Sequence, residues 1–182
     1  VLATALAFPA ALQAADEYAV DPVHSVVLAK IKHLNVSNFY ARFNDVSGKV
    51  VVDEADPAKS SVEVVVKADS FDSNNEKRDQ HVKSPDFLNV KQFPVITYKS
   101  TAIKKTGDQQ YEVTGDLTLH GETKPVTASF TVVGNGKDPR GASIIGAETR
   151  FTFKRREFGM GFMLEGLSDE IEVIVSVEAR KE

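Results

Sequence analysis

The chain has 182 residues and contains neither cysteine nor tryptophan. Without cysteine it can form no disulfide bond, no thiolate metal site and no cysteine nucleophile. Its formal net charge is -4 at pH 7 and it has no run of lysine or arginine longer than three residues, which argues against binding to nucleic acid phosphates. With 42% hydrophobic and 26% charged residues, the composition suits one globular domain with a substantial core.

The first 14 residues carry no charge, are rich in alanine and leucine, and end in small side chains. This pattern is typical of the apolar region and cleavage end of a secretory signal whose basic start is missing. We therefore expect residues 1–15 to be a signal remnant, residues 16–182 to be the folded domain, and the mature protein to be periplasmic. The alternative is a structured N-terminal helix. The segment is too short to span a membrane, which takes about 20 apolar residues.

From Tyr18 onward, apolar and polar residues alternate with a period of two, which indicates strands that have one polar and one apolar face. The clearest alternation covers residues 27–32, 62–67, 111–120, 126–132, 147–154 and 170–178. Short turns rich in glycine, proline, asparagine and aspartate separate such segments and favour antiparallel pairing. About eight antiparallel strands can close into a barrel without free edges. We therefore predict an all-β fold.

The inward faces of this barrel would carry mainly valine, alanine, leucine and threonine, with phenylalanine on few strands. A barrel of about eight strands either fills itself with side chains or holds one slender ligand. Small lining residues favour the second outcome. A flattened barrel or a sandwich with a dry core is the alternative.

The alternation breaks in residues 78–98, where charged residues, phenylalanines and prolines are concentrated. Asn74 or Asn75 is a suitable N-cap, and the residue before Pro85 is pushed out of the helical region. The sequence therefore predicts a short helical insert near residues 75–88. Such an insert in a chain of strands is suited to covering one opening of a barrel.

Few residues suggest catalysis or metal binding. The four histidines, His24, His33, His81 and His120, form neither an H-x-H nor an H-E-x-x-H pair, so we predict no metal site, and only a scattered one assembled in space is left open. His81 with Asp79 and Asp86 could act as an acid and base cluster. The alternative is that Arg78, Asp79 and Asp86 pair with one another and with the backbone to fix the insert. No G-x-S-x-G elbow or glycine-rich phosphate loop occurs.

Four segments match a known family through their residues and spacing. They are Tyr18–Ser25 with Asp21 and His24, the R-D-x-H-x-x-S-x-D-F pattern of residues 78–87, Gly115–Thr127, and Phe153–Gly159 with Arg155 and Phe158. Together they make residues 17–181 resemble the YceI-like family of secreted bacterial proteins. The resemblance implies an extended, eight-stranded, antiparallel, lipocalin-like barrel that binds a polyisoprenoid in an apolar tunnel. The expected ligand is a quinone tail, such as that of ubiquinone, or a polyprenyl phosphate, and members are often dimers.

We therefore expect a carrier or store for an isoprenoid lipid, without catalytic cofactor or activity. The candidate tunnel contacts are Phe43, Phe71, Phe87, Phe93, Tyr98, Phe130, Phe151, Phe153, Phe158, Met160 and Phe162, and the candidate polar anchors are His24, Arg78, His81 and Arg155. Residues 158–163 hold both methionines of the chain and form either an adaptable ligand contact or a core plug. The alternatives are an enzyme that acts on a lipid headgroup and a stress-related envelope protein with a dry barrel and a protein partner.

Overall fold

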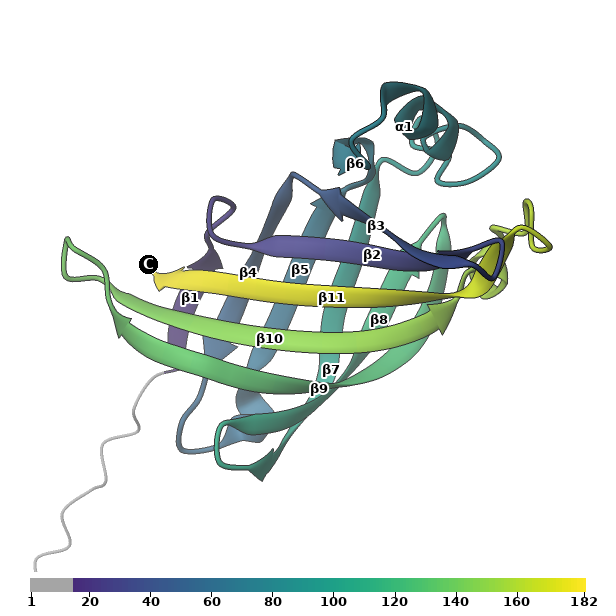
Figure 1. Cartoon of the computed structure of the whole chain (residues 1–182). Helices are drawn as coiled ribbons and strands as arrows, with labels where there is room; N and C mark the ends of the chain where they lie inside the picture. The colour runs from purple at the N-terminus through teal and green to yellow at the C-terminus, as the bar shows by residue number, and fades with distance from the viewer. Residues whose placement is uncertain (1–14) are drawn as a thin grey trace, which may run out of the picture.

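The computed structural model describes residues 15–182, so the expected signal remnant lies, apart from Ala15, outside the described residues. The described chain forms one antiparallel sheet of eleven strands (Figure 1). The strands are β1 (Asp16–Val20), β2 (Val26–His33), β3 (Ser37–Phe43), β4 (Val46–Val52), β5 (Ser61–Lys67), β6 (Phe71–Asp72), β7 (Val95–Gly107), β8 (Gln110–Leu119), β9 (Glu122–Lys137), β10 (Ser143–Lys154) and β11 (Leu167–Lys181). The predicted all-β fold is confirmed.

The sheet closes because β1 pairs with β4 on one side and with β11 on the other. The closed ring runs β1-β4-β5-β7-β8-β9-β10-β11, which is the predicted eight-stranded antiparallel barrel. Beyond it, β2 pairs with residues 167–176 of β11, β3 pairs with β2, and β6 pairs with β3. These three strands extend the wall on one side of the barrel.

The chain crosses the barrel wall in eight passes. Three of these passes are interrupted and form two strands each, which gives eleven strands. The first pass breaks into β1 and β2 at residues 21–25, the second into β3 and β4 at residues 44–45, and the third into β5 and β6 at the 3-10 turn η2 (Ala68–Ser70). Pro22 lies in the first interruption, where its missing N–H cannot contribute to a strand ladder. The sequence therefore predicted the number of passes, and the breaks lie where three passes bend.

The single α-helix of the described chain, α1 (Glu76–Val82), lies in the predicted insert and sits above one end of the barrel in Figure 1. Asn75 caps it, because the Asn75 side chain accepts a hydrogen bond of 3.0 Å from the Arg78 N–H. The helix has 7 residues and covers only part of the predicted insert at residues 75–88, since it already ends at Lys83, before Pro85. No helix within residues 15–182 has the length and hydrophobicity that a membrane crossing needs.

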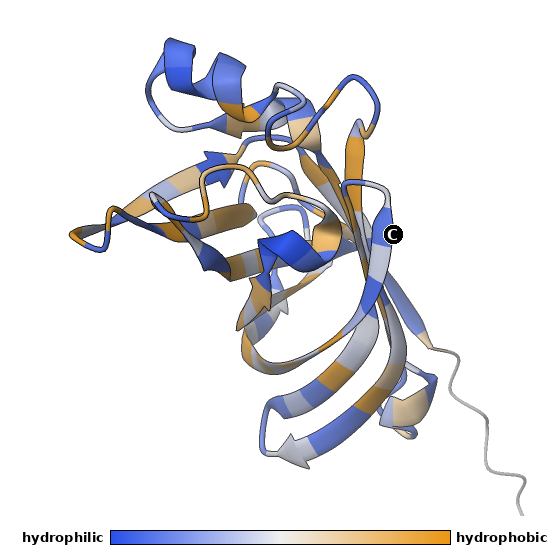
Figure 2. Cartoon of the chain, turned by 90° about the vertical axis from the view of Figure 1, so that its right-hand side faces the viewer, coloured by the Kyte–Doolittle hydropathy of each residue, from blue (hydrophilic) through white to orange (hydrophobic). Residues whose placement is uncertain are grey.

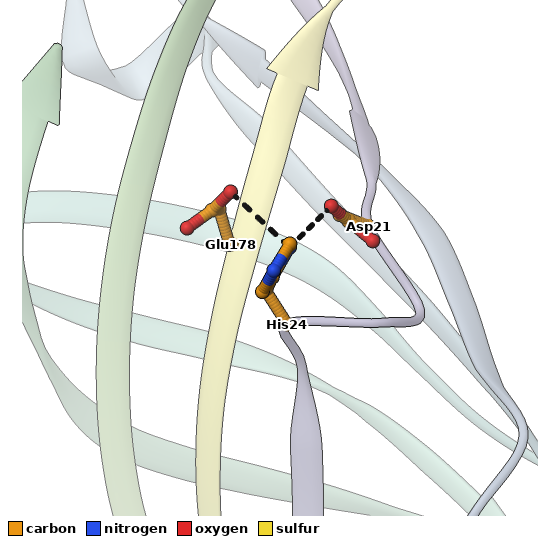
Figure 3. A group of neighbouring side chains, drawn as sticks. All are labelled: Asp21, His24 and Glu178. Atoms are coloured by element: carbon orange, nitrogen blue, oxygen red, sulfur yellow. Dashed lines mark hydrogen bonds and ion pairs between the residues drawn. The ribbon is translucent and has the colours of Figure 1, made fainter. Parts of the chain in front are cut away.

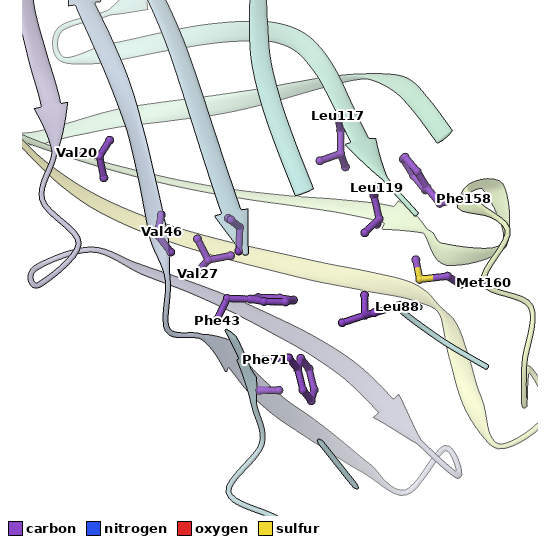
Figure 4. Close-up of a cluster of buried hydrophobic side chains, with 12 residues drawn as sticks. Val20, Val27, Phe43, Val46, Phe71, Leu88, Leu117, Leu119, Phe158 and Met160 are labelled. Carbon is purple, nitrogen blue, oxygen red and sulfur yellow. The ribbon is translucent and has the colours of Figure 1, made fainter. Parts of the chain in front are cut away.

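The strands alternate in hydropathy along their length, as the colouring of Figure 2 shows. Their apolar faces point into the barrel and meet in one core cluster, which Figure 4 shows in close-up. On β11 the inward positions are Ile171, Val173, Val175 and Val177, as the period of two predicted. Two further 3-10 turns complete the fold, η1 (Pro57–Lys59) and η3 (Arg155–Phe158).

Candidate ligand-binding site

The barrel encloses a cavity of about 440 Å³. This volume lies in the range of about 300–1,000 Å³ that small-molecule sites occupy. All three strands of the barrel's extended wall and all eight strands of its ring contribute side chains, and the lining is overwhelmingly aliphatic and aromatic. The barrel therefore does not fill itself, because valines and alanines occupy many inward positions, such as Ala29, Val64 and Ala128.

The cavity is long and narrow. Its lining follows β11 from Leu167 to Val177, and ten residues of a strand span about 33 Å. Val20, Val50 and Val62 line the end near Val177, and these residues come from the closed part of the ring. Such a shape suits a thin, extended hydrocarbon chain better than a compact ligand.

The other end of the cavity is its mouth. Five lining residues are exposed, His33, Ser37, Arg78, His81 and Met163, and all five belong to three neighbouring segments. These segments are the turn between β2 and β3, the helical insert, and the loop between β10 and β11. The cavity therefore reaches the surface at this end, where about half of the His81 and Met163 side chains is exposed.

Arg155 organises one side of the mouth from a buried position, at 2% exposure. Its guanidinium donates to four backbone carbonyls: Ser168 at 2.9 Å, Met160 at 2.9 Å, Phe162 at 2.7 Å and Leu167 at 3.1 Å. These bonds hold the loop between β10 and β11 against the barrel. Burial lowers the pKa of Arg155 from its usual value, but a guanidinium keeps its charge at any physiological pH.

Arg78 holds the opposite side of the mouth. Its Nε and Nη2 donate to the Oγ and the carbonyl of Ser73 at 2.8 Å and 2.7 Å. Its guanidinium carbon lies 4.3 Å from the ring centroid of Phe39 on β3, a cation–π contact that joins the insert to the barrel. Asp79 accepts hydrogen bonds from the Ser73 N–H and hydroxyl. The alternative in which these side chains fix the insert is correct for the backbone, since Arg78 and Asp79 both bind backbone groups of Ser73. Arg78 and Asp79 do not pair directly, because the Ser73 hydroxyl links them.

A cluster of three rings bridges the insert and the loop. The His81 ring contacts the rings of Phe87 and Phe162 edge to face, with centroids 5.1 Å and 5.6 Å away, and Phe87 and Phe162 lie 5.3 Å apart. His81 Nε2 lies 2.9 Å from Asp86 Oδ2. Asp79 binds Ser73 instead, so the three residues that could have formed an acid and base cluster do not converge.

Tyr98 contributes the one phenol group of the cavity lining, and its hydroxyl lies against the barrel wall. Its hydroxyl donates to the Val113 and Val126 carbonyls at 3.2 Å and 3.4 Å as alternative acceptors. Burial raises the pKa of Tyr98 to about 12. Gly115 makes room for the ring, since a Cβ there would lie 2.6 Å from Tyr98 Cζ. The cavity thus holds a neutral hydroxyl that is already hydrogen-bonded.

Comparison with known proteins identifies the family. The family model of the YceI-like domain matches residues 18–179. A UPF0312 protein of Pseudomonas aeruginosa (strain LESB58) is 40% identical over 173 residues, which cover 94% of this chain and 90% of that protein. The chain belongs to the YceI-like family. The resemblance that the four sequence segments indicated is therefore confirmed.

Two solved structures place this YceI-like chain among known barrels. The crystal structure of BcnA from Burkholderia cenocepacia superposes with a TM-score of 0.80 at 27% identity and covers 87% of this chain and 98% of BcnA. A polyisoprenoid binding domain from Saccharophagus degradans, implicated in plant cell wall breakdown, has a TM-score of 0.70 at 13% identity and covers 91% and 98% of the two chains. The second likeness shows the shared fold.

Eleven of the fifteen candidate ligand contacts line the cavity of this YceI-like protein. They are Phe43, Phe71, Phe87, Tyr98, Phe130, Phe151, Phe153, Met160, Arg78, His81 and Arg155. The strand residues among them lie there because the period of two placed their side chains on the inward face. Met160 is 5% exposed and lines the cavity, whereas Met163 reaches the mouth. Residues 158–163 therefore serve both the core and the cavity.

Three candidate aromatic residues do not line the cavity. Phe158 is 1% exposed and packs edge to face on Phe153 with centroids 5.1 Å apart, so it is part of the packed core. Phe93 packs on His120 with centroids 4.5 Å apart. Phe162 is 39% exposed and belongs to the ring cluster at the mouth. All three come from irregular segments, where no periodicity determines which way a side chain points.

The fourth candidate outside the lining, His24, lies in the loop between β1 and β2, next to the Val177 end of the cavity, and Figure 3 shows it between Asp21 and Glu178. Its Nδ1 lies 2.8 Å from Asp21 Oδ2 and 3.7 Å from Glu178 Oε1. The hydrogen bond with Asp21 raises the pKa of His24 and lowers that of Asp21. The three side chains hold their ligand atoms within 4.8 Å of one another, so they are the scattered group that the sequence left open, on the exposed outer surface.

Several lining residues were missed at the mouth and on β3. His33 and Phe39 are among them. The alternation of Val27, Ala29 and Ile31, continued by two residues, predicts an inward His33. The same period leads back from Phe43 to Phe39. The alternation that points both side chains inward was present in the sequence. The turn between β2 and β3 conceals it, because β2 ends and β3 begins there.

Proposed function

We propose that this protein binds a long isoprenoid lipid in the barrel cavity and carries or stores it in the bacterial periplasm. The observation that supports this proposal best is the cavity of about 440 Å³, which is narrow, apolar and open at one end. Each CH2 group that leaves water for such a cavity contributes about 0.8 kcal/mol. A long chain therefore binds tightly without any directed polar contact.

The comparisons support a binding protein rather than an enzyme. The chain belongs to the YceI-like family, and a domain of the same fold from Saccharophagus degradans is described as a polyisoprenoid binding domain. An isoprenoid is a slender, flexible hydrocarbon, which matches the narrow valine-lined cavity. The ubiquinone tail and the polyprenyl chain share this shape, so the wall of the cavity accepts either.

The proposal is tested by extracting the purified, folded protein with organic solvent and analysing the extract by mass spectrometry. An unrelated barrel protein purified in the same way is the control for adhering lipid. We expect about one isoprenoid molecule for each protein chain. An empty extract, together with no uptake of added quinone or prenol after expression in a host rich in isoprenoids, would overturn the proposal.

A further inference from the structure

Two loops beside the mouth carry more exposed apolar side chains than the rest of the described chain. They are the turn between β2 and β3 and the loop between β10 and β11, which Figure 1 shows together at the end where β11 begins. Of the nine exposed large apolar side chains within residues 15–182, five lie in these two loops. The three most exposed of the five are Val36 at 84%, Leu34 at 57% and Met163 at 47%. We call these three residues the apolar tip.

The apolar tip forms one surface and adjoins the cavity. The Leu34 N–H donates to the Gly166 carbonyl at 2.7 Å, which joins the two loops. A Cβ on Gly166 would lie 3.2 Å from Met163 Cε and 3.6 Å from Leu34 Cδ2, so both side chains lie beside Gly166. His33 and Ser37, on either side of the turn, line the cavity, as does Met163. The tip is therefore the outer margin of the mouth.

Folding alone does not favour large apolar side chains at two of these positions. Leu34 and Met163 have φ angles of 49° and 52°, in the left-handed region that glycine and asparagine adopt most readily. Asn35, between Leu34 and Val36, has a φ of 57° and follows this preference. A leucine and a methionine at such positions add backbone strain to the exposure of apolar surface. Backbone strain of this kind is concentrated at functional sites.

The chain carries no charge around the tip. Residues 34–38 and 159–164 contain no aspartate, glutamate, lysine or arginine, although 26% of the chain is charged. Charged residues begin directly behind these stretches, with Lys32 and Glu165, which are both exposed. An exposed apolar patch with a polar border marks contact with a membrane or with another protein.

The size and place of the tip favour a membrane over a protein. A stable protein interface involves about 20–30 residues on each side, whereas the two uncharged stretches have five and six residues. A bilayer requires no matching shape, and apolar side chains bind it in proportion to the apolar area that they bury. The tip also adjoins the mouth of an apolar cavity. A hydrocarbon chain that leaves the mouth at a bilayer surface avoids unfavourable contact with water.

We propose that the apolar tip docks this protein on the surface of a zwitterionic lipid bilayer, where its three side chains enter the boundary between headgroups and acyl chains. Docking holds the mouth against the bilayer while an isoprenoid enters or leaves the cavity. The proposal rests on the proposed function for what passes through the mouth, whereas docking itself requires no bound lipid. Because the tip is uncharged, docking needs no anionic lipid and responds little to salt.

The first test uses the absence of cysteine, because one introduced cysteine then carries a label at a single place. Val36→Cys and Val133→Cys receive the same environment-sensitive dye. Val133 is an exposed valine of β9, and its neighbour Gly134 pairs with Gly146, far from the loop that follows β10. With millimolar phosphatidylcholine vesicles, we expect the emission of the dye at position 36 to shift to the blue and that of the dye at position 133 to stay unchanged. Spin-labelled lipids should quench only the first dye.

The second test measures transfer of a fluorescent prenol from the protein to vesicles by stopped flow. Docking predicts a transfer rate that rises with vesicle concentration, whereas release through water gives a constant rate. Leu34→Asn/Val36→Ser removes two side chains that are not part of the cavity lining, and asparagine suits the left-handed backbone at position 34. We expect this variant to transfer prenol roughly tenfold more slowly and to bind it in solution as before. Val23→Ser/Val133→Ser, which removes two exposed valines elsewhere, is the matched control and should transfer prenol at the unchanged rate.

The outcomes separate this proposal from the proposed function. A dye at position 36 that does not respond to vesicles overturns docking, and the carrier stands if prenol still binds in solution. A dye that responds on a protein that binds no prenol supports docking and overturns the carrier. A transfer rate that depends neither on vesicle concentration nor on the tip overturns docking as the route of exchange. A doubled mass in sedimentation that is lost in Leu34→Asn/Val36→Ser shows contact between two copies and overturns the bilayer as the partner.

Discussion

The wall of the cavity and its mouth differ in how their residues are positioned. Along the wall, regular strands such as β5 and β11 present valines at every second residue, so many similar side chains form the same apolar surface. At the mouth, irregular segments are held by individual contacts, above all the four carbonyls bound by Arg155. The wall is therefore redundant, whereas the mouth depends on single residues.

The largest effect is expected from the residue that organises the mouth. Arg155→Ala leaves four carbonyls without their donor in a buried place, and the loss of stability should be about 3 kcal/mol or more. Arg156→Ala is the matched control, since its pairing with Asp169 lies at an exposed side chain, and it should cost less than about 1 kcal/mol. Urea denaturation of both variants measures the difference. Equal losses would contradict the role of Arg155.

A larger side chain on the wall should shorten the tunnel without harming the mouth. Val175 lines the cavity toward the end away from the mouth, so Val175→Phe should weaken binding of long prenols by about 0.8 kcal/mol for each CH2 group displaced. Short prenols should bind as before. Ile174→Phe, which is not part of the lining, is the control on the same strand. The affinity of a series of prenol lengths reports the result, and a uniform loss at all lengths would contradict it.

A close contact in the wall should be less tolerant than an open position in the same barrel. A Cβ at Gly115 would meet Tyr98 Cζ and the Lys99 carbonyl oxygen, each at 2.6 Å, whereas a Cβ at Gly134 would meet nothing within 4 Å. Gly115→Ala should therefore cost about 1–3 kcal/mol through overpacking, and Gly134→Ala almost nothing. Thermal unfolding of the two variants is the measurement. A tolerant Gly115 would show that Tyr98 can move into the cavity.

The ring cluster at the mouth should affect ligand release more than folding. Phe162→Ala removes edge-to-face contacts with His81 and Phe87. One aromatic pair of this kind contributes about 0.5–1.5 kcal/mol beyond the burial of its surface. We expect a bound prenol to leave severalfold faster, with little change in unfolding. Leu164→Ala, which is also partly exposed in this loop, should change neither. Stopped-flow transfer to vesicles measures the rate, and an unchanged rate would remove the cluster as a barrier.

The smallest effect is expected far from the mouth, at Asp21 and His24. The hydrogen bond between them raises the pKa of His24 above 6.5 and lowers that of Asp21 below 3.8. The stabilisation by His24 is therefore complete below pH 6.5 and is lost as pH rises through its raised pKa. The stabilisation by Asp21 is complete above pH 3.8 and is lost as pH falls through its lowered pKa.

An NMR titration of the His24 ring measures the pKa of His24 and checks this prediction. Asp21→Asn should return the pKa of His24 toward its usual value, because the hydrogen-bonded carboxylate is gone. Lipid binding at the mouth should not respond to this change. A titration of His24 that does not depend on Asp21 would contradict the pairing.

Much of the wall could be predicted from the sequence, and little of the mouth. The period of two correctly placed Val64, Phe151 and Val175 on the inward face, because alternate side chains of a strand must point to opposite sides. Phe158 and Phe162 lie in a loop, where neighbouring side chains follow no fixed period. The sequence indicated their apolar character and left their direction open.

An all-β chain of about eight passes, a helical insert capped at Asn74 or Asn75, and membership of the YceI-like family could be inferred from the sequence. Only the tertiary structure decided that the barrel remains hollow and that His33, Arg78, His81 and Arg155 meet at one end. The physical reason is range: strand alternation and capping act between neighbours in the chain. The cavity and its mouth arise from segments that are distant in the sequence and become neighbours only when β1 and β11 close the barrel.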